Sequence, residues 1–114
     1  MLSSKRKSET LPEEAMRSEV RSRLAVLRQR SYSELQALPE WSSDELTVEG
    51  VAADTTTYRE GEPPGPLRII VQFSTKPRRF LCVLRLRQVV AEGFEMQPDG
   101  GTEELSENEL HYYM

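Results

Sequence analysis

Apolar residues recur at helical spacing in the first third of the chain. They lie three or four positions apart, among charged residues, at Met16, Val20, Leu24 and Leu27. This pattern is typical of an amphipathic helix with one narrow apolar stripe. Thr10 and Glu13 have the spacing of a capping box, which marks a helix start. We therefore predict a helix over about residues 12–30, with its stripe packed on a sheet.

A second, shorter helix is predicted directly afterwards. Ser31 and Glu34 repeat the capping-box spacing, and the helix should end before Pro39. Its contacts with the body of the protein would come from Tyr32, Leu35 and Leu38. Trp41 follows, and we interpret it as a core anchor, because aromatic rings supply much of a small core's buried area. A platform for stacking a ligand is the alternative.

The middle of the chain has the alternating pattern of strands. Leu46 and Val48 alternate with polar residues. Residues 51–59 are β-prone but weakly apolar, as in an edge strand or a strand with one solvated face. Gly50 lies between these runs and suits a tight turn or a bulge. Residues 60–66 contain three prolines and two glycines, so we predict a loop there.

Two further apolar runs between residues 67 and 91 predict consecutive strands. One face of the first run carries Leu67, Ile69, Val71 and Phe73, and one face of the second carries Phe80, Cys82, Leu84 and Leu86. We place the turn between them at Lys76-Pro77. The alternation breaks near Gln88, which indicates a bulge or bend.

The C-terminal part continues this alternation and then ends in a helical signal. Phe94 and Met96 alternate up to a turn at residues 98–101. Ser106 and Glu109 again have capping-box spacing. Apolar and aromatic residues follow at Leu110, Tyr112 and Tyr113. This order predicts a short helix docked on the rest of the protein.

One helix followed by consecutive strands with short links predicts an antiparallel sheet, since no second long helix is present for a parallel crossover. We expect an α+β fold in which the N-terminal helix packs on a curled four- to five-stranded antiparallel sheet. A chain of 114 residues has the size of one domain. We assign residues 1–9 to a flexible tail and residues 10–114 to a single domain.

Charge is distributed unevenly along an acidic chain, whose net charge is −4. Residues 67–91 contain six basic residues and no acidic one, whereas residues 39–66 and 92–114 have net charges of −6 and −7. In a meandering sheet each basic strand would lie beside an acidic one, and opposite charges across strands stabilise pairing. We therefore expect Arg68, Arg85 and Arg87 to pair with Glu49, Asp54, Glu92 or Glu95.

A cationic binding face is the alternative interpretation of the same arginines. It would combine helix and hairpin residues, namely Arg17, Arg21, Arg28, Arg78 and Arg79. Nucleic acid is not the partner we expect, because the pI is near 5.1 and nucleic-acid modules are usually basic. In addition, no aromatic residues lie between these arginines to stack single-stranded bases.

The sequence offers few groups for catalysis or metal binding. His111 is the single histidine and lies near the C-terminus, and Cys82 is the single cysteine, interpreted as a buried, inert thiol. We expect no cofactor, no metal and no catalytic residue. No apolar run approaches the roughly 20 residues of a membrane span. We expect a soluble protein of the reducing cytoplasm that does not associate with membranes.

Two segments resemble small uncharacterised bacterial proteins. They are the string Tyr32-Ser33-Glu34-Leu35 running to Leu38-Pro39, and Pro98-Asp99-Gly100 before an acidic C-terminal end. The resemblance covers residues 31–114. It implies a stand-alone domain and assigns no catalytic residue.

The function we expect is non-enzymatic binding of a protein partner or of a second copy as a homodimer. The two central strands carry apolar residues on a second face, at Ile70, Leu81 and Val83, which a single helix cannot reach. These residues need either a partner or the protein's own short helices as a cover. With the neighbouring Arg85 and Arg87, these are the candidate partner contacts. A small-ligand carrier or small enzyme with a pocket between sheet and helix is one alternative, and weak nucleic-acid contact through the arginines is another.

Overall fold

The structure is a computed structural model that describes residues 11–75, 78–80, 84–86 and 88–114. In residues 78–80 and 84–86 it describes the backbone alone. In chain order the elements are α1 (Glu13–Arg28), α2 (Tyr32–Gln36), β1 (Trp41–Val48), β2 (Val51–Glu60), β3 (Leu67–Thr75), β4 (Arg78–Phe80), β5 (Leu84–Leu86), β6 (Val89–Met96), β7 (Thr102–Glu104), α3 (Glu107–Leu110) and the 3-10 turn η2 (His111–Tyr113).

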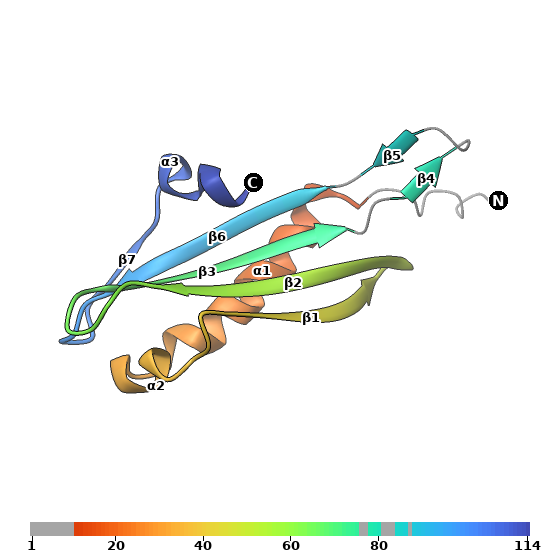
Figure 1. The fold of residues 1–114 in the computed structure, drawn as a ribbon. Coiled ribbons are helices and arrows are strands. Elements are labelled where there is room, and N and C mark those ends of the chain that lie inside the picture. Colours follow the sequence, from red (N-terminus) through yellow and green to blue (C-terminus); the bar gives the residue numbers. More distant parts are fainter. Residues whose placement is uncertain (1–10, 76–77, 81–83, 87) are drawn as a thin grey trace.

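One antiparallel sheet organises the molecule (Figure 1). It has five strands in the order β1-β2-β3-β6-β7, so β1 and β7 are its edges and it does not close into a barrel. Helix α1 packs on one face, which we call the front face, and the opposite face is the back face. The predicted α+β class, with an N-terminal helix on an antiparallel sheet, is confirmed.

The main core lies between α1 and the front face. Met16, Val20 and Leu24 of α1 are buried there, as the helical spacing predicts. They meet the front face of β3, formed by Leu67, Ile69, Val71 and Phe73. The predicted helix start needs a correction. Pro12 is the N-cap and makes no side-chain hydrogen bond, so Glu13 is the first helical residue and cannot complete a capping box from Thr10, which lies outside the described residues.

The second helix forms as its capping signal predicts. The Ser31 hydroxyl accepts a hydrogen bond from the Glu34 N–H at 3.2 Å, and the Glu34 carboxylate accepts one from the Ser31 N–H at 2.8 Å. Leu35 is buried in the main core, and Tyr32 and Leu38 pack against it. This helix closes the end of the sheet at which β1 begins (Figure 1).

A tight hairpin joins β1 to β2. Glu49 and Gly50 both have positive φ angles, of 50° and 84°, as the two central residues of a type I′ turn require. Strand β2 lies between β1 and β3, so the interpretation of residues 51–59 as an edge strand is wrong. Its alternative, a partly solvated face, is correct, because Thr56 and Tyr58 on the back face are only half-buried.

The second correction concerns the chain after β3. We predicted a turn at Lys76-Pro77 and a single strand through Phe80, Cys82, Leu84 and Leu86. Instead β4 and β5 pair with each other, Phe80 opposite Leu84, and β3 pairs with β6, Ser74 opposite Val89. The chain therefore reverses between β4 and β5. We call this hairpin the arm, and it projects beyond the end of the sheet (Figure 1).

The break in alternation near Gln88 is confirmed, because this residue separates β5 from β6. The Gln88 carbonyl accepts a hydrogen bond from the Thr75 N–H at 2.9 Å, and the Gln88 N–H donates to the Thr75 hydroxyl at 2.7 Å. These bonds continue the link between β3 and β6 to the base of the arm.

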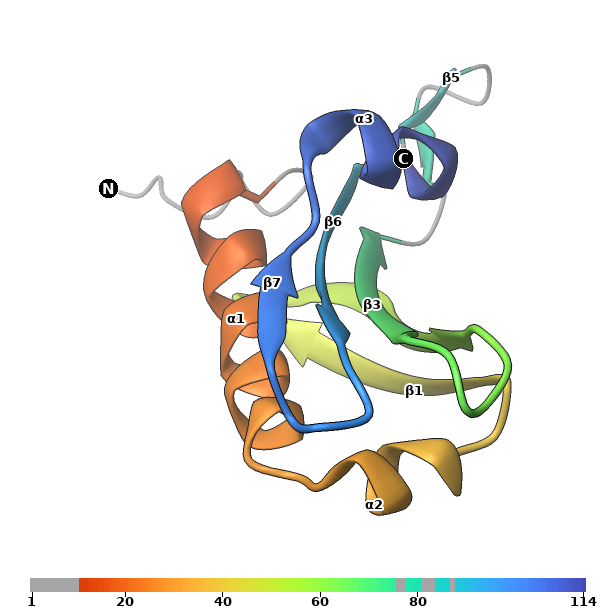
Figure 2. The same ribbon diagram turned by 90° about the vertical axis from the view of Figure 1, so that its left-hand side faces the viewer.

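The C-terminal segment, residues 105–114, packs on the back face, opposite to α1 (Figure 2). Leu110 and Tyr113 are buried against Ile70 and Ala91, and Tyr58 packs on the same cluster. Ser106 and Glu109 form the predicted capping box. The predicted docked C-terminal helix is thus confirmed, and it supplies a small second core from the protein's own chain.

Candidate functional site

Of the five predicted partner contacts, the structure describes the side chain of Ile70 alone. Ile70 is 1 % exposed and lies under the C-terminal segment. Leu81, Val83 and Arg87 lie outside the described residues, and Arg85 has a described backbone position in β5 only. Partner contact at these residues therefore stays a prediction. A partner could reach Ile70 only if the C-terminal segment moved away.

Trp41 is the main correction to the sequence interpretation, since it is not a core anchor. Its side chain is 64 % exposed. It is the first residue of an edge strand and stands directly opposite Tyr58 of β2. Tyr58 packs on the cluster under the C-terminal segment, but no described residue buries the indole of Trp41 fully. The sequence signal was the polar string Ser42-Ser43-Asp44-Glu45, which directly follows Trp41 in its strand.

An open groove of about 630 Å³ lies beside Trp41. Its walls are the end of α2, the start of β1, the end of β2 and the loop after β2. Trp41 and Tyr58 are the aromatic residues that line it. The loop after β2 is the proline- and glycine-rich segment predicted from the sequence, so loop and sheet end together shape this surface.

The groove is lined by more negative than positive charge. Glu40, Glu60 and Glu62 line it, and none of the three forms an ion pair within the described part of the chain. Arg59 is its single lining cation, and its guanidinium Nε donates a hydrogen bond to the Leu38 carbonyl at 2.8 Å. Arg59 is therefore used to hold the segment before β1, while the three carboxylates face solvent.

Strand β1 is an edge of the described sheet and lies next to this groove. The Arg59 N–H donates to the Glu40 carbonyl at 2.9 Å, so Glu40 and every second residue after it bond toward β2. The residues in between direct their N–H and C=O groups away from the sheet, at Trp41, Ser43, Glu45 and Thr47. No other described strand lies beyond β1, and its eight residues include no proline, glycine or lysine to block pairing.

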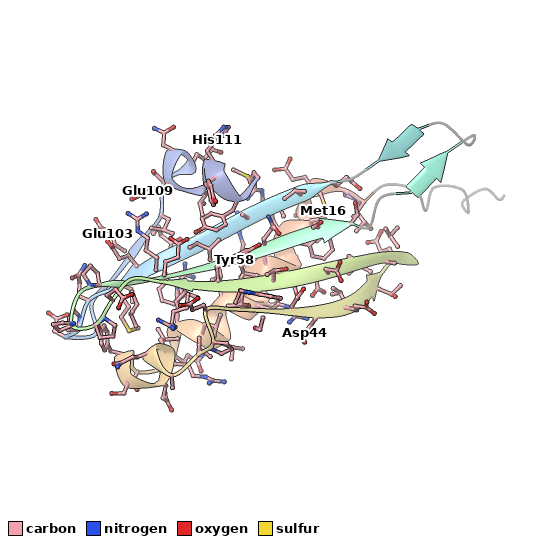
Figure 3. The ribbon with its side chains drawn as sticks, viewed as in Figure 1. Met16, Asp44, Tyr58, Glu103, Glu109 and His111 are labelled. Carbon is pink, nitrogen blue, oxygen red and sulfur yellow. The ribbon has the colours of Figure 1, made fainter. Side chains whose placement is uncertain are left out.

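Aromatic rings connect the groove to the C-terminal segment. The ring centroids of Tyr58 and Tyr113 lie 5.0 Å apart, and those of Tyr113 and Tyr112 lie 5.2 Å apart in an edge-to-face arrangement. Figure 3 shows Tyr58 on the same side of the sheet as His111 and Asp44 on the other side. With Trp41 opposite Tyr58, the back face therefore carries an aromatic row that starts at the exposed edge.

Ion pairs neutralise the charged residues on the front face. The Glu92 carboxylate lies 2.9 Å from Arg17 and 3.1 Å from Arg21, and Arg28 pairs with Glu104. Hydrogen bonds to Glu13 and then to Glu92 raise the pKa of the Arg17 guanidinium. The three helix arginines of the alternative cationic face are thus bound to acids of the same chain.

The predicted pairing of Arg68 with Glu95 is present, at 3.6 Å, and Arg68 also pairs with Glu109 at 2.9 Å. Glu92, which we had also considered for the sheet arginines, is occupied by the helix instead. The side chains of Arg85 and Arg87 lie outside the described part of the structure.

Within the described ranges, no three His, Cys, Asp or Glu side chains are grouped so that they could hold a metal ion. None of the described helices is both long enough and apolar enough to cross a membrane.

Comparisons with protein-family models, with curated proteins and with solved structures found no match to this chain.

Proposed function

We propose that this protein is a non-enzymatic protein-binding domain that takes an extended segment of its partner along the free edge of β1. The observation that carries the proposal is the position of Trp41, which is largely exposed at the start of an eight-residue edge strand. A partner strand would bond to the outward backbone groups of β1 and cover the indole at one end.

Two general properties of strand addition favour the β1 edge beside Trp41 as the binding surface. Addition of a strand to a free sheet edge gains affinity from main-chain hydrogen bonds and specificity from alternate side chains. Tryptophan is enriched among the residues that dominate binding energy, because its large ring is buried on association. Tyr58 and the groove offer a second wall beside the ring. The outward backbone groups of β1 and the exposed ring of Trp41 thus lie next to each other.

This proposal moves the partner from the apolar face to the edge. A homodimer through Ile70 would first require the C-terminal segment to leave the back face, at the loss of its contacts with Leu110 and Tyr113. Pairing at β1 needs no such rearrangement. A cytoplasmic location is part of the proposal, because the single cysteine of the chain cannot form an intrachain disulfide.

Binding of a small ligand in the groove is the second candidate. The volume of about 630 Å³ lies within the range of small-molecule sites, which is about 300–1,000 Å³. Those sites are mostly apolar, however, and this groove is lined by three glutamates and an arginine. A small ligand would need Trp41 and Tyr58 but not the backbone groups of β1, and this difference separates the two candidates.

The test uses the fact that Trp41 is the only tryptophan in the chain, so its fluorescence reports directly on the groove. A panel of labelled extended peptides, basic, neutral and acidic, is titrated with the protein while Trp41 emission and peptide anisotropy are followed. We expect the basic peptides to bind most tightly, because three unpaired carboxylates line the groove.

Two variants of Ser43 separate edge pairing from other binding. Ser43→Pro removes an outward N–H and leaves the bonds to β2 in place, since proline is tolerated at such edge positions. Ser43→Ala is the matched control, because both changes remove the hydroxyl contact with Thr56. We expect Ser43→Pro to weaken peptide binding at least about tenfold and Ser43→Ala to have little effect. Equal binding by both variants would exclude strand addition, and no binding by any peptide would refute the proposed function.

A further inference from the structure

We propose that the segment bound at β1 is the β4–β5 arm of a second copy, so that the protein associates with itself head to tail. This inference rests on the proposed function, because it names the partner of the same edge and groove.

Charge complementarity selects the arm. The groove carries Glu40, Glu60 and Glu62 in its lining. The Asp44 carboxylate of β1 pairs with Arg23 at 3.6 Å and is not counted among them. The arm belongs to the chain segment that has six basic residues and no acidic residue between positions 67 and 91. It is therefore the most strongly cationic hairpin that the chain can offer to an anionic edge.

The arm and the groove lie at opposite ends of the sheet. The groove is at the end where β1 begins, and the arm extends from the end where β1 finishes (Figure 1). Strand β1 alone is about 27 Å long at 3.4 Å per residue. An arm therefore cannot fold back onto its own groove, and the contact requires two copies.

The backbone register of the arm places two arginines at facing positions. Arg79 stands directly opposite Arg85 in the β4–β5 pair, and like charges at facing positions destabilise strand pairing. Carboxylates of a neighbouring copy would offset that repulsion. Phe80 stands opposite Leu84 at the next position of the register, so the hairpin also has an apolar pair in its sequence to offer a partner that exposes Trp41.

The same charges argue against a symmetric pairing of β1 with β1. Directly opposed residues lie on the same face of a sheet, so antiparallel pairing of two β1 strands about their midpoint would place Asp44 opposite Asp44, or Glu45 opposite Glu45, of the other copy. Acidic pairs would then face each other across the interface, which costs stability. A basic strand on the acidic edge has no such conflict.

Nucleic acid is a less favoured occupant of the arm. A polyanion needs an extended cationic surface, and the helix arginines that could extend it are paired with Glu13, Glu92 and Glu104. The basic residues of the arm are thus not continued by free arginines of α1 among Arg17, Arg21 and Arg28.

Arm-to-groove contact joins two different surfaces, so it is a heterologous interface. Such interfaces generate closed rings if the rotation closes, and open chains if it does not. The contact should weaken with added salt, because the exposed charges are screened beyond about 10 Å at 0.1 M ionic strength.

Complementation between two defective copies tests the proposal. The groove variant is Trp41→Ala with Ser43→Pro, and the arm variant is Arg79→Glu with Arg85→Glu. Sedimentation velocity at low salt should show wild-type protein growing in mass with concentration and each variant remaining at 13.1 kDa. An equimolar mixture should form a 1:1 complex of twice that mass and no larger species, since each copy keeps one working surface.

A milder arm variant tests whether the loss of association comes from the charge change and not from misfolding. Arg79→Gln with Arg85→Gln removes the charges without adding acids and should raise the apparent dissociation constant at least about tenfold. Circular dichroism checks that every variant keeps the fold. A wild-type protein that stays monomeric at several hundred micromolar and low salt would overturn the inference. So would an arm variant that associates like wild type, or a mixture that gives no complex.

These outcomes are distinguishable from failure of the proposed function. If wild type is monomeric but external basic peptides still bind in a Ser43→Pro-sensitive manner, the edge binds another protein and only the self-association is wrong. If neither the peptides nor a second copy bind, both proposals fail. A third outcome would also overturn the inference. In it the wild-type protein does not self-associate but binds a DNA oligonucleotide in a salt-sensitive manner, and the arm variant does not bind it.

Discussion

The side-chain amide of Gln88 hydrogen-bonds the backbone of Leu11 twice. Its Oε1 accepts from the Leu11 N–H and its Nε2 donates to the Leu11 carbonyl, both at 2.8 Å. The two residues are 77 positions apart in the chain. One side chain therefore fixes the segment before α1 to the start of β6 and the base of the arm.

Replacing Gln88 should destabilise the fold. Gln88→Leu leaves the partly buried N–H and carbonyl of Leu11 without partners, and an unsatisfied polar group of this kind costs about 1–3 kcal/mol. Urea unfolding measures the change. Gln29→Ala is the control, because Gln29 is exposed at the end of α1 and its backbone N–H, not its side chain, donates to the Val26 carbonyl. Equal stability of the two variants would show that the Gln88 contact contributes nothing.

Two adjacent tyrosines should respond very differently to truncation. Tyr113 is 8 % exposed and stacks on Tyr58, whereas Tyr112 is 87 % exposed. We expect Tyr113→Ala to lower the free energy of unfolding by about 3 kcal/mol, as for other buried aromatic residues, and Tyr112→Ala to change it by less than about 0.5 kcal/mol.

The Tyr113→Ala protein should also expose the second face of the central strands. Ile70 and Ala91 lose their cover when the C-terminal segment loosens, so binding of a hydrophobic dye should rise above that of Tyr112→Ala. If dye binding and stability were the same in both variants, the C-terminal segment would not be the cover that its packing indicates.

The C-terminal capping box should be sensitive to acid. The Ser106 N–H donates to the Glu109 carboxylate at 2.8 Å, and this hydrogen bond lowers the pKa of Glu109 below its ordinary value of 4.5. A lowered pKa in the folded state means that the carboxylate supports the fold above pH 4.5, and this support is lost as the pH falls through the folded-state pKa.

Hydrogen exchange of the Leu110 amide, which bonds to the Ser106 carbonyl, measures this effect. Exchange, corrected for its intrinsic pH dependence, should accelerate below pH 4.5. Glu109→Gln keeps an acceptor for the cap but does not titrate, so it should remove that pH dependence. An unchanged acid response in Glu109→Gln would assign the transition to another group.

The local signals of this sequence were sufficient for its helices. Ser31 with Glu34 and Ser106 with Glu109 form the predicted capping boxes because the bonds span three residues and need no distant partner. The alternation of β3 was equally informative. Its second apolar face, at Ile70, indicated that a partner or the short helices must cover it, and the structure shows that Leu110 and Tyr113 of the C-terminal segment do so.

The errors arose where long-range arrangement decides the outcome. Two apolar strands look alike on either side of a reversal, so alternation could not show that the chain reverses between Phe80 and Leu84. The predicted turn at Lys76-Pro77 lies outside the described residues. Trp41 was misplaced for a related reason. Whether an aromatic residue is buried depends on which strand forms the edge, and here β1, not β2, has that position.

Exposure of Trp41 makes its removal a test of its role. Trp41→Ala should lower the free energy of unfolding by less than about 1 kcal/mol, the range of a cross-strand pair such as the one with Tyr58. Phe94→Ala is the matched control, because Phe94 is fully buried and its loss should cost about 3–5 kcal/mol. Unfolding is best measured at low protein concentration and high salt, where self-association is suppressed. In the wild-type protein under those conditions, an added quencher should reduce Trp41 fluorescence readily. At high protein concentration and low salt the quenching should be weaker, because self-association covers the indole. If Trp41→Ala were as unstable as Phe94→Ala, Trp41 would be a buried core residue. The proposed binding edge would then have no exposed aromatic residue for a partner to cover.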